Sequence, residues 1–250
     1  MEAGLRALVV SDLHANAEAL RAVMARVRRK KFEVVFCLGD FVGYGAQPNH
    51  VLDVMRTMRG RKVYIRGNHD RVAAGLDNAD GFNQAARAAA LWTRDHLSAP
   101  NRRFLRELPM GPTMHRGVML CHGSPYDEDE YVFNVHHAAQ ILGLFDAPYI
   151  VFGHTHLPAV FSIDAQGNVR GFAVRDEATV KLEANQRYLI NPGSVGQPRD
   201  RNPAASCMIL DTDKRSVQFL RVEYDVSKTQ ATIVKAGLPS ILASRLQFGT

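Results

Sequence analysis

The chain has 250 residues, of which 46% are hydrophobic and 22% are charged, and its formal net charge is +6 at pH 7. This composition is typical of a globular protein with a sizeable core and excludes a disordered chain. No apolar run approaches the roughly 18–20 residues of a membrane-spanning helix, so we expect no membrane contact. Much of the positive charge lies in residues 26–31, at the expected end of a helix, where cations complement the helix dipole. We therefore do not expect a nucleic-acid partner.

The cysteines and the first residues both bear on the compartment. Cys37, Cys121 and Cys207 each lie inside an apolar run, which favours buried reduced thiols over disulfides. Residues 1–12 have a shorter apolar core than a signal peptide and carry a charge at Glu2. We expect a cytoplasmic protein.

The first part of the chain alternates short apolar runs with helical patterns. Residues 5–12 form an apolar run that polar residues close, which predicts a buried strand. Leu20, Val23, Met24 and Val27 then follow at helical spacing. By the same criteria we predict strands at 5–12, 33–40, 62–70, 117–125 and 147–156, and helices at 16–30, 48–58, 81–97, 101–108 and 136–145. This alternation predicts parallel strands covered by helices.

The pattern changes after Pro158. Four stretches there are typical of strands joined by tight turns, with a hairpin signal at residues 164–168. They are residues 159–174, 186–195, 205–212 and 216–225, and a helical segment at 226–246 closes the chain. We predict a largely antiparallel second sheet and a single α/β domain over residues 1–250. The mainly helical stretch 71–116 is a candidate lid.

Polar side chains follow each of the five predicted strands of the first part. They are Asp12 and His14, then Asp40, then Asn68, His69 and Asp70, then His122, and finally His154 and His156. The carboxyl ends of parallel strands meet at one edge of a sheet, where α/β proteins bind ligands. Residues two apart in an extended segment share a face, so both histidines of the last pair can reach one site.

Each of these motifs alone is more typical of a turn, a helix cap or a core histidine than of a functional site. Together they would leave carboxylates and imidazoles crowded and unpaired unless a cation held them. Two of the carboxylates, the amide and four of the imidazoles make seven candidate ligands. This number exceeds the three or four ligands that one zinc ion takes, which favours two metals about 3.5–4 Å apart. The mixed oxygen and nitrogen donors suit two divalent ions of manganese, iron, zinc, cobalt or nickel.

These motifs match a known family. The series DLH, GD, GNHD, H and GHTH resembles the signature of the calcineurin-like metallophosphoesterases over roughly Leu5 to Val222. The stretches GDFVGYGAQP, HGSP and INPGSVGQPRD are similar to its small bacterial and archaeal branch, which includes phosphodiesterases and diadenosine tetraphosphatase-related proteins. The resemblance implies a four-layer α/β/β/α sandwich of two mixed sheets flanked by helices.

The resemblance also implies a role for each site residue. The first metal would be held by Asp12, His14 and His156, the second by Asn68, His122 and His154, and Asp40 would bridge them. His69 would be a catalytic residue that binds no metal and is oriented by Asp70. A hydroxide held by both ions would attack phosphorus while the ions neutralise the phosphoryl oxygens.

Two arginines are candidates for contacting phosphate. Arg66 can share the face of the site, and phosphoprotein phosphatases carry a phosphate-binding arginine at this place, so we predict a catalytic role for it. Those enzymes have Asp-Arg-Gly after the second motif, whereas this chain has Gly43–Gly45 with a tyrosine between, which disfavours a phosphoprotein substrate. Arg199 is either a second phosphate clamp or a turn residue.

We therefore expect a dinuclear-metal hydrolase of phosphoester bonds that acts on a small or nucleotide substrate, either a phosphodiester or a phosphomonoester. The alternatives are a protein serine/threonine phosphatase and a non-catalytic scaffold, and the presence of His69 disfavours the scaffold. We expect the acidic run at residues 127–130 to be a solvated loop. Phe82, Trp92 and Phe104 could stack on a base, but packing of the helices against the body is the favoured interpretation.

Overall fold

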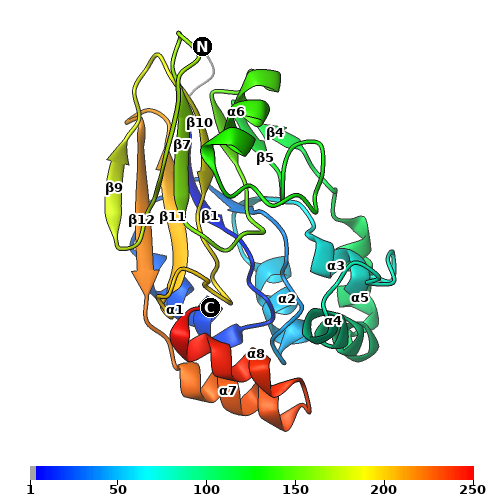
Figure 1. Cartoon of the computed structure of the whole chain (residues 1–250). Helices are drawn as coiled ribbons and strands as arrows, with labels where there is room; N and C mark the ends of the chain where they lie inside the picture. The colour runs from blue at the N-terminus through cyan, green and yellow to red at the C-terminus, as the bar shows by residue number, and fades with distance from the viewer. Residues whose placement is uncertain (1–3) are drawn as a thin grey trace.

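The computed structural model describes residues 4–250, which form two mixed six-stranded β-sheets packed face to face. Helices cover the outer face of each sheet (Figure 1). The predicted four-layer α/β/β/α sandwich is confirmed.

The first sheet combines strands from both ends of the chain, in the order β3-β2-β1-β11-β12-β9. Its strands are β1 (Arg6–Val10), β2 (Val34–Cys37), β3 (Arg61–Tyr64), β9 (Ala178–Lys181), β11 (Ala205–Asp211) and β12 (Ser216–Val222). β1, β2 and β3 are parallel, and β11 pairs antiparallel with β1.

The second sheet has the order β4-β5-β6-β10-β7-β8. Its strands are β4 (Thr113–His115), β5 (Val118–Leu120), β6 (Tyr149–Val151), β7 (Ala159–Ile163), β8 (Val169–Ala173) and β10 (Arg187–Asn191). β5, β6 and β10 are parallel, and the other pairings are antiparallel.

The helices fall into three groups. α1 (Ala17–Val27) packs on the outer face of the first sheet beside α2 (Pro48–Thr57), and α6 (Val135–Leu144) packs on the second sheet. α3 (Asn68–Ala73), α4 (Gln84–His96) and α5 (Ala99–Glu107) form a cluster at one side of the molecule (Figure 1). α7 (Val226–Lys235), α8 (Ser240–Ser244) and the 3-10 helix η1 (Arg245–Phe248) pack together near α1. No helix among residues 4–250 is long and apolar enough to cross a bilayer.

The core follows from the two-residue period of the strands. In β1, Ala7 and Val9 point into the space between the sheets, where they join Phe36 and residues of the second sheet. Leu8 and Val10 point the other way and pack with α1. Both faces of β1 are therefore buried, which explains why the strand has a continuous apolar run. The three cysteines are buried free thiols, as predicted.

Two expectations about the strands are wrong. The second half of the chain does not form a separate antiparallel sheet, because β11, β12 and β9 complete the first sheet while β5 and β6 belong to the second. The strand expected at 62–70 ends at Tyr64, and Asn68 begins helix α3. The helix starts there because the Asp70 carboxylate accepts a hydrogen bond from the Gly67 N–H, which satisfies a backbone donor at the helix N-terminus.

Asn16 joins three segments close to the end of β1. Its side-chain oxygen accepts from the Ala19 N–H, which caps α1, and from the Thr229 hydroxyl of α7. Its amide nitrogen donates to the Gly196 carbonyl at 2.9 Å. The residue is buried. If its side chain were removed, its three partner groups would lose a hydrogen bond at a place where water cannot replace it.

We predict that Asn16→Ala lowers the free energy of unfolding by roughly 2–3 kcal/mol, because a cap and two buried hydrogen bonds are lost together. The matched control is Asn134→Ala, which removes the exposed cap of α6 and should cost about 1 kcal/mol. Urea denaturation of both variants measures the difference. Equal losses would show that the junction at Asn16 adds nothing to its capping bond.

Candidate metal centre

The predicted site residues converge at one edge of the molecule, although their strands belong to two sheets. Asp12 follows β1 and Asp40 follows β2 of the first sheet, while His122 follows β5 and His154 follows β6 of the second. Convergence of five strand ends on one sheet edge is therefore not the correct explanation. The sheets are stacked with these strand ends on the same side, so loops from both layers meet there.

The loops that carry the site have unusual backbone conformations. Asp12, His14, Asp40, His154 and His156 all have positive φ, between 46° and 65°. Non-glycine residues rarely adopt this left-handed conformation, and the strain persists only where the surrounding structure enforces it. Here the N–H groups of Asp12 and His14 donate to the carbonyls of the loop after β2, which holds the first two loops together. Such clusters of strained residues are typical of functional sites.

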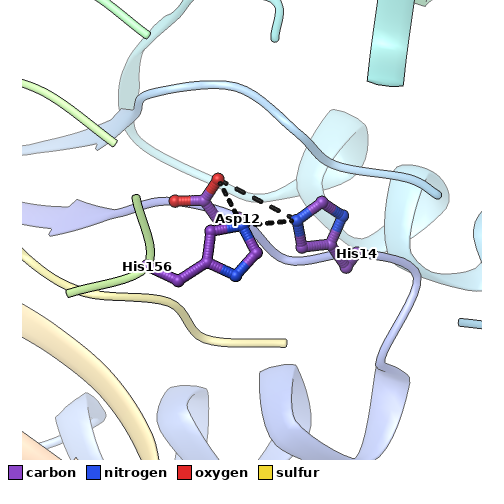
Figure 2. A group of neighbouring side chains, drawn as sticks. All are labelled: Asp12, His14 and His156. Atoms are coloured by element: carbon purple, nitrogen blue, oxygen red, sulfur yellow. Dashed lines mark hydrogen bonds and ion pairs between the residues drawn. The ribbon is translucent and has the colours of Figure 1, made fainter. Parts of the chain in front are cut away.

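One group of potential ligands consists of Asp12, His14 and His156 (Figure 2). The Oδ1 atom of Asp12 lies 3.4 Å from His156 Nε2 and 3.9 Å from His14 Nε2. The two imidazole Nε2 atoms are 3.1 Å apart. All three side chains are buried, so no bulk water separates them.

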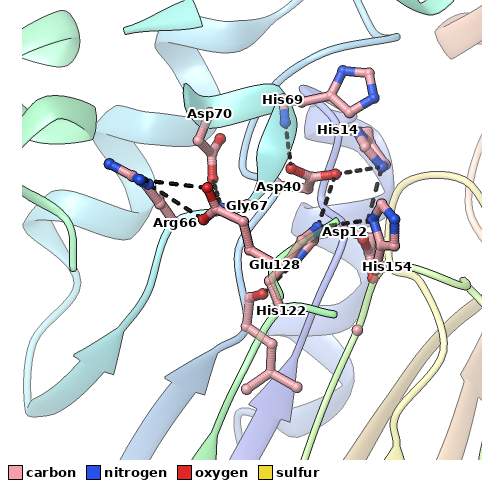
Figure 3. Close-up of polar contacts among 12 residues, drawn as sticks. Asp12, His14, Asp40, Arg66, Gly67, His69, Asp70, His122, Glu128 and His154 are labelled. Carbon is pink, nitrogen blue, oxygen red and sulfur yellow. Dashed lines mark hydrogen bonds and ion pairs between the residues drawn. The ribbon is translucent and has the colours of Figure 1, made fainter. Parts of the chain in front are cut away.

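A second group lies beside the first and consists of Asp40, His122 and His154 (Figure 3). His154 Nδ1 is 3.2 Å from His122 Nε2. The Oδ2 atom of Asp40 lies 3.5 Å from His122 Nε2 and 3.6 Å from His14 Nε2, so it stands between the two groups. Its other oxygen accepts a hydrogen bond from the His69 N–H at 2.9 Å.

The four imidazoles share one hydrogen-bonding arrangement. His14, His122 and His156 each direct Nδ1 to a backbone carbonyl, those of Val42, Leu38 and Gln197, at distances of 3.0, 2.7 and 2.6 Å. His154 directs Nε2 to the carbonyl of Asp129 at 3.1 Å. A carbonyl can only accept, so each of these nitrogens carries the proton. The remaining nitrogen of every neutral ring then presents a lone pair to the centre of the cluster.

The donors fit a pair of divalent cations. Both carboxylate oxygens of Asp12 and the side-chain oxygen of Asn68 are buried, and none has a hydrogen-bond partner within residues 4–250. Two pairs of imidazole nitrogens also face one another, and in the neutral rings neither nitrogen of a pair carries a proton. Burying unpartnered acceptors is costly, and a cation placed among them removes that cost. The buried histidine and aspartate clusters are consistent with a dinuclear metal site, and carboxylate, amide and imidazole donors suit several transition metals.

The proton affinities of these groups are strongly perturbed. Burial, reinforced by the nearby charge of Asp40, raises the pKa of Asp12 to about 7. Burial lowers the pKa of His154 to about 3, and it lowers the pKa of His14 and His156 as well. Burial acts in the same direction on His122, but the carboxylate of Asp40 outweighs it and raises the pKa of His122 to about 10. In the metal-free protein, protons therefore partly occupy the place of the cations.

The segment from Asn191 to Gln197 forms hydrogen bonds to the loops that carry the candidate ligands. Ser194 Oγ and the Gly196 N–H both donate to the Asp12 carbonyl at 2.8 Å. The Asn191 amide donates to the Gly153 carbonyl, just before the histidine pair, and Gln197 accepts from His156. In the sequence, this segment indicates only the branch of the family. Its density of glycine, serine and asparagine is the signal that could have indicated a turn built to bind neighbouring backbone.

A cavity of about 260 Å³ opens onto the metal centre. Asp40, Asn68, His69, His154 and His156 line its floor. Its walls include Tyr44, Arg71, Phe82, Asp129, Tyr131 and Arg199. Phe82 was expected mainly to pack the helices against the body. Its ring also borders the cavity, with its centre 4.7 Å from the centre of the His69 ring, so this expectation describes its position only in part. Tyr44, Arg71 and Tyr131 are wall residues that the sequence analysis missed, because no motif marks them.

Arg66 and the acidic run form an unexpected pair. The Arg66 guanidinium lies 3.4 Å from Glu128 at both of its contacts, and Arg71 also pairs with Glu128 (Figure 3 shows Arg66 and Glu128). Glu128 is 7% exposed, so the expectation of a solvated loop is wrong for this residue. Arg71 further contacts Asp77 and Asp129 at 3.0 and 2.8 Å. Of the three arginines, Arg71 and Arg199 line the cavity.

Asp70 does not contact the imidazole that it is expected to orient. Its carboxylate accepts from the N–H groups of Val42 and Gly67, and His69 Nδ1 has no hydrogen-bond partner in the described chain. That nitrogen faces Gly43, where a side chain would overlap the ring. His69 is instead positioned by its backbone hydrogen bond to Asp40 and by ring contacts with Tyr44 at 4.4 Å and His14 at 5.0 Å.

Comparison with known proteins places the chain in a family. A family model described as the calcineurin-like phosphoesterase superfamily domain matches residues 5–215. Because the match covers most of the chain, the protein belongs to the calcineurin-like phosphoesterase superfamily, which confirms the resemblance seen in the sequence.

Relatives occur in archaea and bacteria. The chain is 37% identical over 247 residues to an uncharacterised protein of Methanocaldococcus jannaschii, with 96% of this chain and 97% of the relative covered. The crystal structure of a metallophosphoesterase from Sphaerobacter thermophilus is also 37% identical, covers 99% of this chain and 100% of its own, and has a TM-score of 0.85. A hypothetical protein from Pyrococcus horikoshii OT3 shares the fold at 20% identity, with a TM-score of 0.78 and 98% of each chain covered.

We predict that metal binding tightens as pH rises. Asp12 and His122 carry raised pKa values of about 7 and about 10, so ions must displace their protons, and this displacement is harder at low pH. The affinity for Mn²⁺ should increase roughly tenfold or more between pH 6 and pH 8. Isothermal titration calorimetry in two buffers of different ionisation enthalpy measures both affinity and proton release.

The control for this titration is Asp12→Asn, which removes one titrating ligand and should weaken binding while releasing fewer protons. Binding of Mn²⁺ with equal affinity at both pH values and without proton release would contradict the proposed ligand set.

Proposed function

We propose that the protein is a dinuclear-metal hydrolase of phosphoester bonds, acting on a small phosphoester or a nucleotide. The observation that carries the proposal is the set of four imidazole lone pairs and two buried carboxylates that face a common centre at the floor of a cavity. Asp12, His14 and His156 would hold one ion, and Asn68, His122 and His154 the other, with Asp40 between them. When bound, two such ions lower the pKa of water and neutralise phosphoryl oxygens.

His69 is the proposed proton donor to the leaving group. It lines the cavity, and its Nδ1 is buried against Gly43, so Nε2 is the nitrogen available to a substrate. Burial lowers its pKa to about 4 in the absence of ligand, which leaves the ring neutral near pH 7. A phosphoryl dianion placed beside the ring favours the imidazolium form and so raises its pKa. The proton can then stabilise the leaving oxygen as its bond to phosphorus breaks.

Arg199 is better placed than Arg66 to contact the phosphoryl group. Its guanidinium donates to the Tyr44 hydroxyl at 3.2 Å and to the Gln197 side chain at 3.1 Å, and it lies 5.7 Å from the centre of the Tyr44 ring. No carboxylate of the described chain pairs with it. Arg66, in contrast, has Glu128 as a partner. An arginine free of carboxylates on a cavity wall is suited to hold phosphate oxygens.

The alternative substrates and roles are less consistent with the cavity. A protein phosphatase would have to admit a peptide chain to a space of about 260 Å³ that Phe82 and Tyr131 border. This volume is below the roughly 300–1,000 Å³ of pockets for drug-sized ligands, which favours a small ester or the phosphate end of a nucleotide. A non-catalytic scaffold would not require His69 beside the metal centre.

We predict that the purified protein hydrolyses p-nitrophenyl phosphate, bis-p-nitrophenyl phosphate or both with Mn²⁺, and that a chelator abolishes the activity. His69→Asn should retain both metals and lose roughly 10²–10⁴-fold in kcat, because a general acid contributes about this much. Release of p-nitrophenolate measures turnover, and elemental analysis measures metal content. The preferred ester distinguishes phosphodiesterase from phosphomonoesterase action.

The matched control is His50→Asn, which changes an exposed histidine of α2 that does not line the cavity and should leave turnover unchanged. If a metal-loaded protein hydrolyses neither ester, the scaffold interpretation gains support. Undiminished turnover of His69→Asn at neutral pH would remove His69 from the mechanism.

We further predict that Arg199→Ala raises KM for p-nitrophenyl phosphate about tenfold or more, since a charge-assisted contact to phosphate is lost. Arg66→Ala should change KM by less than about threefold, because its guanidinium is occupied by Glu128. Steady-state kinetics of the two variants decide between them. The opposite ranking would restore Arg66 as the phosphate ligand.

A further inference from the structure

A second groove lies next to the metal-centre cavity and shares one residue with it. The groove has a volume of about 750 Å³, and Arg199 lines both spaces. Leu157 and Pro158, which directly follow the metal-site histidine His156, form part of its wall. The Arg199 N–H also donates to the His156 carbonyl at 3.4 Å. The groove therefore begins at the edge of the metal centre.

The groove carries an excess of free positive charge. Arg175, Arg199 and Arg201 line it, and none of them has an ion-pair partner within residues 4–250. Asp200 lies in the same wall, but its carboxylate is buried against the Arg221 guanidinium, which neutralises it. The exposed Asp176 is the remaining acidic group of the lining. Three cations thus face this space against one uncompensated carboxylate.

The lining of the metal-centre cavity around Arg71 has a different character. Asp77 and Asp129 belong to it, and both contact Arg71, which also pairs with Glu128. Since Arg66 also pairs with Glu128, three carboxylates face two guanidiniums there, which leaves one net negative charge. An anionic group beyond the metal centre is repelled on the Arg71 side and attracted on the Arg199 side.

The backbone around the groove is fixed in part. Arg201 has a left-handed φ of 65°, and its N–H donates to the Gly249 carbonyl at 2.8 Å, which ties this loop to the C-terminal segment. Arg199 is held by Tyr44 and Gln197. The two residues flank Asp200, whose bond to Arg221 anchors the loop between them. The guanidinium groups are thus presented from a supported segment, which reduces the entropy lost on binding an anion.

We propose that this groove binds a second phosphate group of the same substrate, one that is not hydrolysed. The inference rests on the proposed function, because the scissile phosphoryl group must occupy the metal centre for another to reach the groove. Arg199 contacts the boundary between the two groups, and Arg175 and Arg201 bind the second. Guanidinium groups match phosphate oxygens in geometry and charge, so a phosphomonoester is the ligand class that this lining favours.

The test compares two esters that differ by one phosphate: thymidine 5′-(p-nitrophenyl phosphate) and its 3′-phosphorylated form. The 3′-phosphorylated ester should have a KM about tenfold lower, and this advantage should shrink at high salt as the groove charges are screened. In the double variant Arg175→Ala/Arg201→Ala the advantage should fall to about twofold or less, since the second phosphate loses its ligands. Arg175→Lys/Arg201→Lys should keep part of it.

The matched control is Arg59→Ala/Arg61→Ala, which also removes two exposed positive charges, at the start of β3 and thus at the opposite end of the strands from the site. It should preserve the full advantage, which separates the groove from net charge. Equal KM values for the two esters in the unmodified protein would overturn the inference, as would an advantage that survives in the double alanine variant.

Failure of the proposed function is distinguishable from failure of the groove. If neither ester is hydrolysed, the groove is tested by calorimetric binding of thymidine 3′,5′-bisphosphate and thymidine 5′-monophosphate to the Mn²⁺-loaded protein. Tighter binding of the bisphosphate that the double alanine variant loses supports the groove without any turnover. Equal affinities for the two nucleotides overturn it.

Discussion

The candidate metal centre depends on one repeated interaction, in which each of four buried imidazoles, in its neutral form, donates its single proton outward to a backbone carbonyl. This arrangement fixes the tautomer and leaves four nitrogen lone pairs facing inward beside the oxygens of Asp12 and Asp40. Without a cation such a group is unfavourable, because acceptors face acceptors in a place that water does not reach. The rest of the fold must therefore be stable enough to offset the unfavourable free energy of these unpaired acceptors.

The two-sheet scaffold supplies that stability in a specific way. The core between the sheets is built from both layers, so the loops after β1, β2, β5 and β6 cannot move apart without opening it. Two of their left-handed residues, Asp12 and His14, donate their N–H groups to carbonyls of the neighbouring loop after β2. Gly67 shows how tightly the loops meet, because a side chain there would overlap the carboxylate of Asp40. The geometry of the donors is therefore set before any ion binds, which is what a preorganised site requires.

Much of this could be predicted from the sequence, and the failures have identifiable causes. The strands that lead to Asp12, Asp40 and His154 are apolar runs ending in polar residues, a pattern that directly reports burial and chain reversal. Sheet membership could not be predicted, since a strand's apolar pattern does not say which sheet receives it. The strands β9 and β4 were missed for a different reason, since neither has a clear apolar pattern. β9 is an exposed edge strand, and β4 is a three-residue edge strand with little burial.

Side-chain partners were harder to predict than ligand types. A carboxylate next to a histidine in sequence suggests a pair, yet Asp70 instead accepts from the Gly67 N–H at the start of α3 and from the Val42 N–H in the loop after β2. Glu128 lies in a run of acidic residues that is typical of a solvated loop, but Arg66 and Arg71 approach it from a distant segment. Such partnerships depend on contacts between loops, which leave no periodic signal in the chain.

The different partners of Arg66 and Arg199 determine where positive charge is available to a substrate phosphate. Glu128 neutralises Arg66, whereas Arg199, which lines the cavity, donates to the hydroxyl of Tyr44. The positive charge available to a phosphate therefore lies on Arg199, in the segment that follows Gln197, and not on Arg66 before α3. Under the proposed function, the phosphoryl group of the substrate lies between the metals and Arg199, and the rest of the substrate extends either toward the aromatic walls or along the arginine-lined groove. Both exits suit a nucleotide, since its base can stack on an aromatic ring while its other phosphates follow the cations.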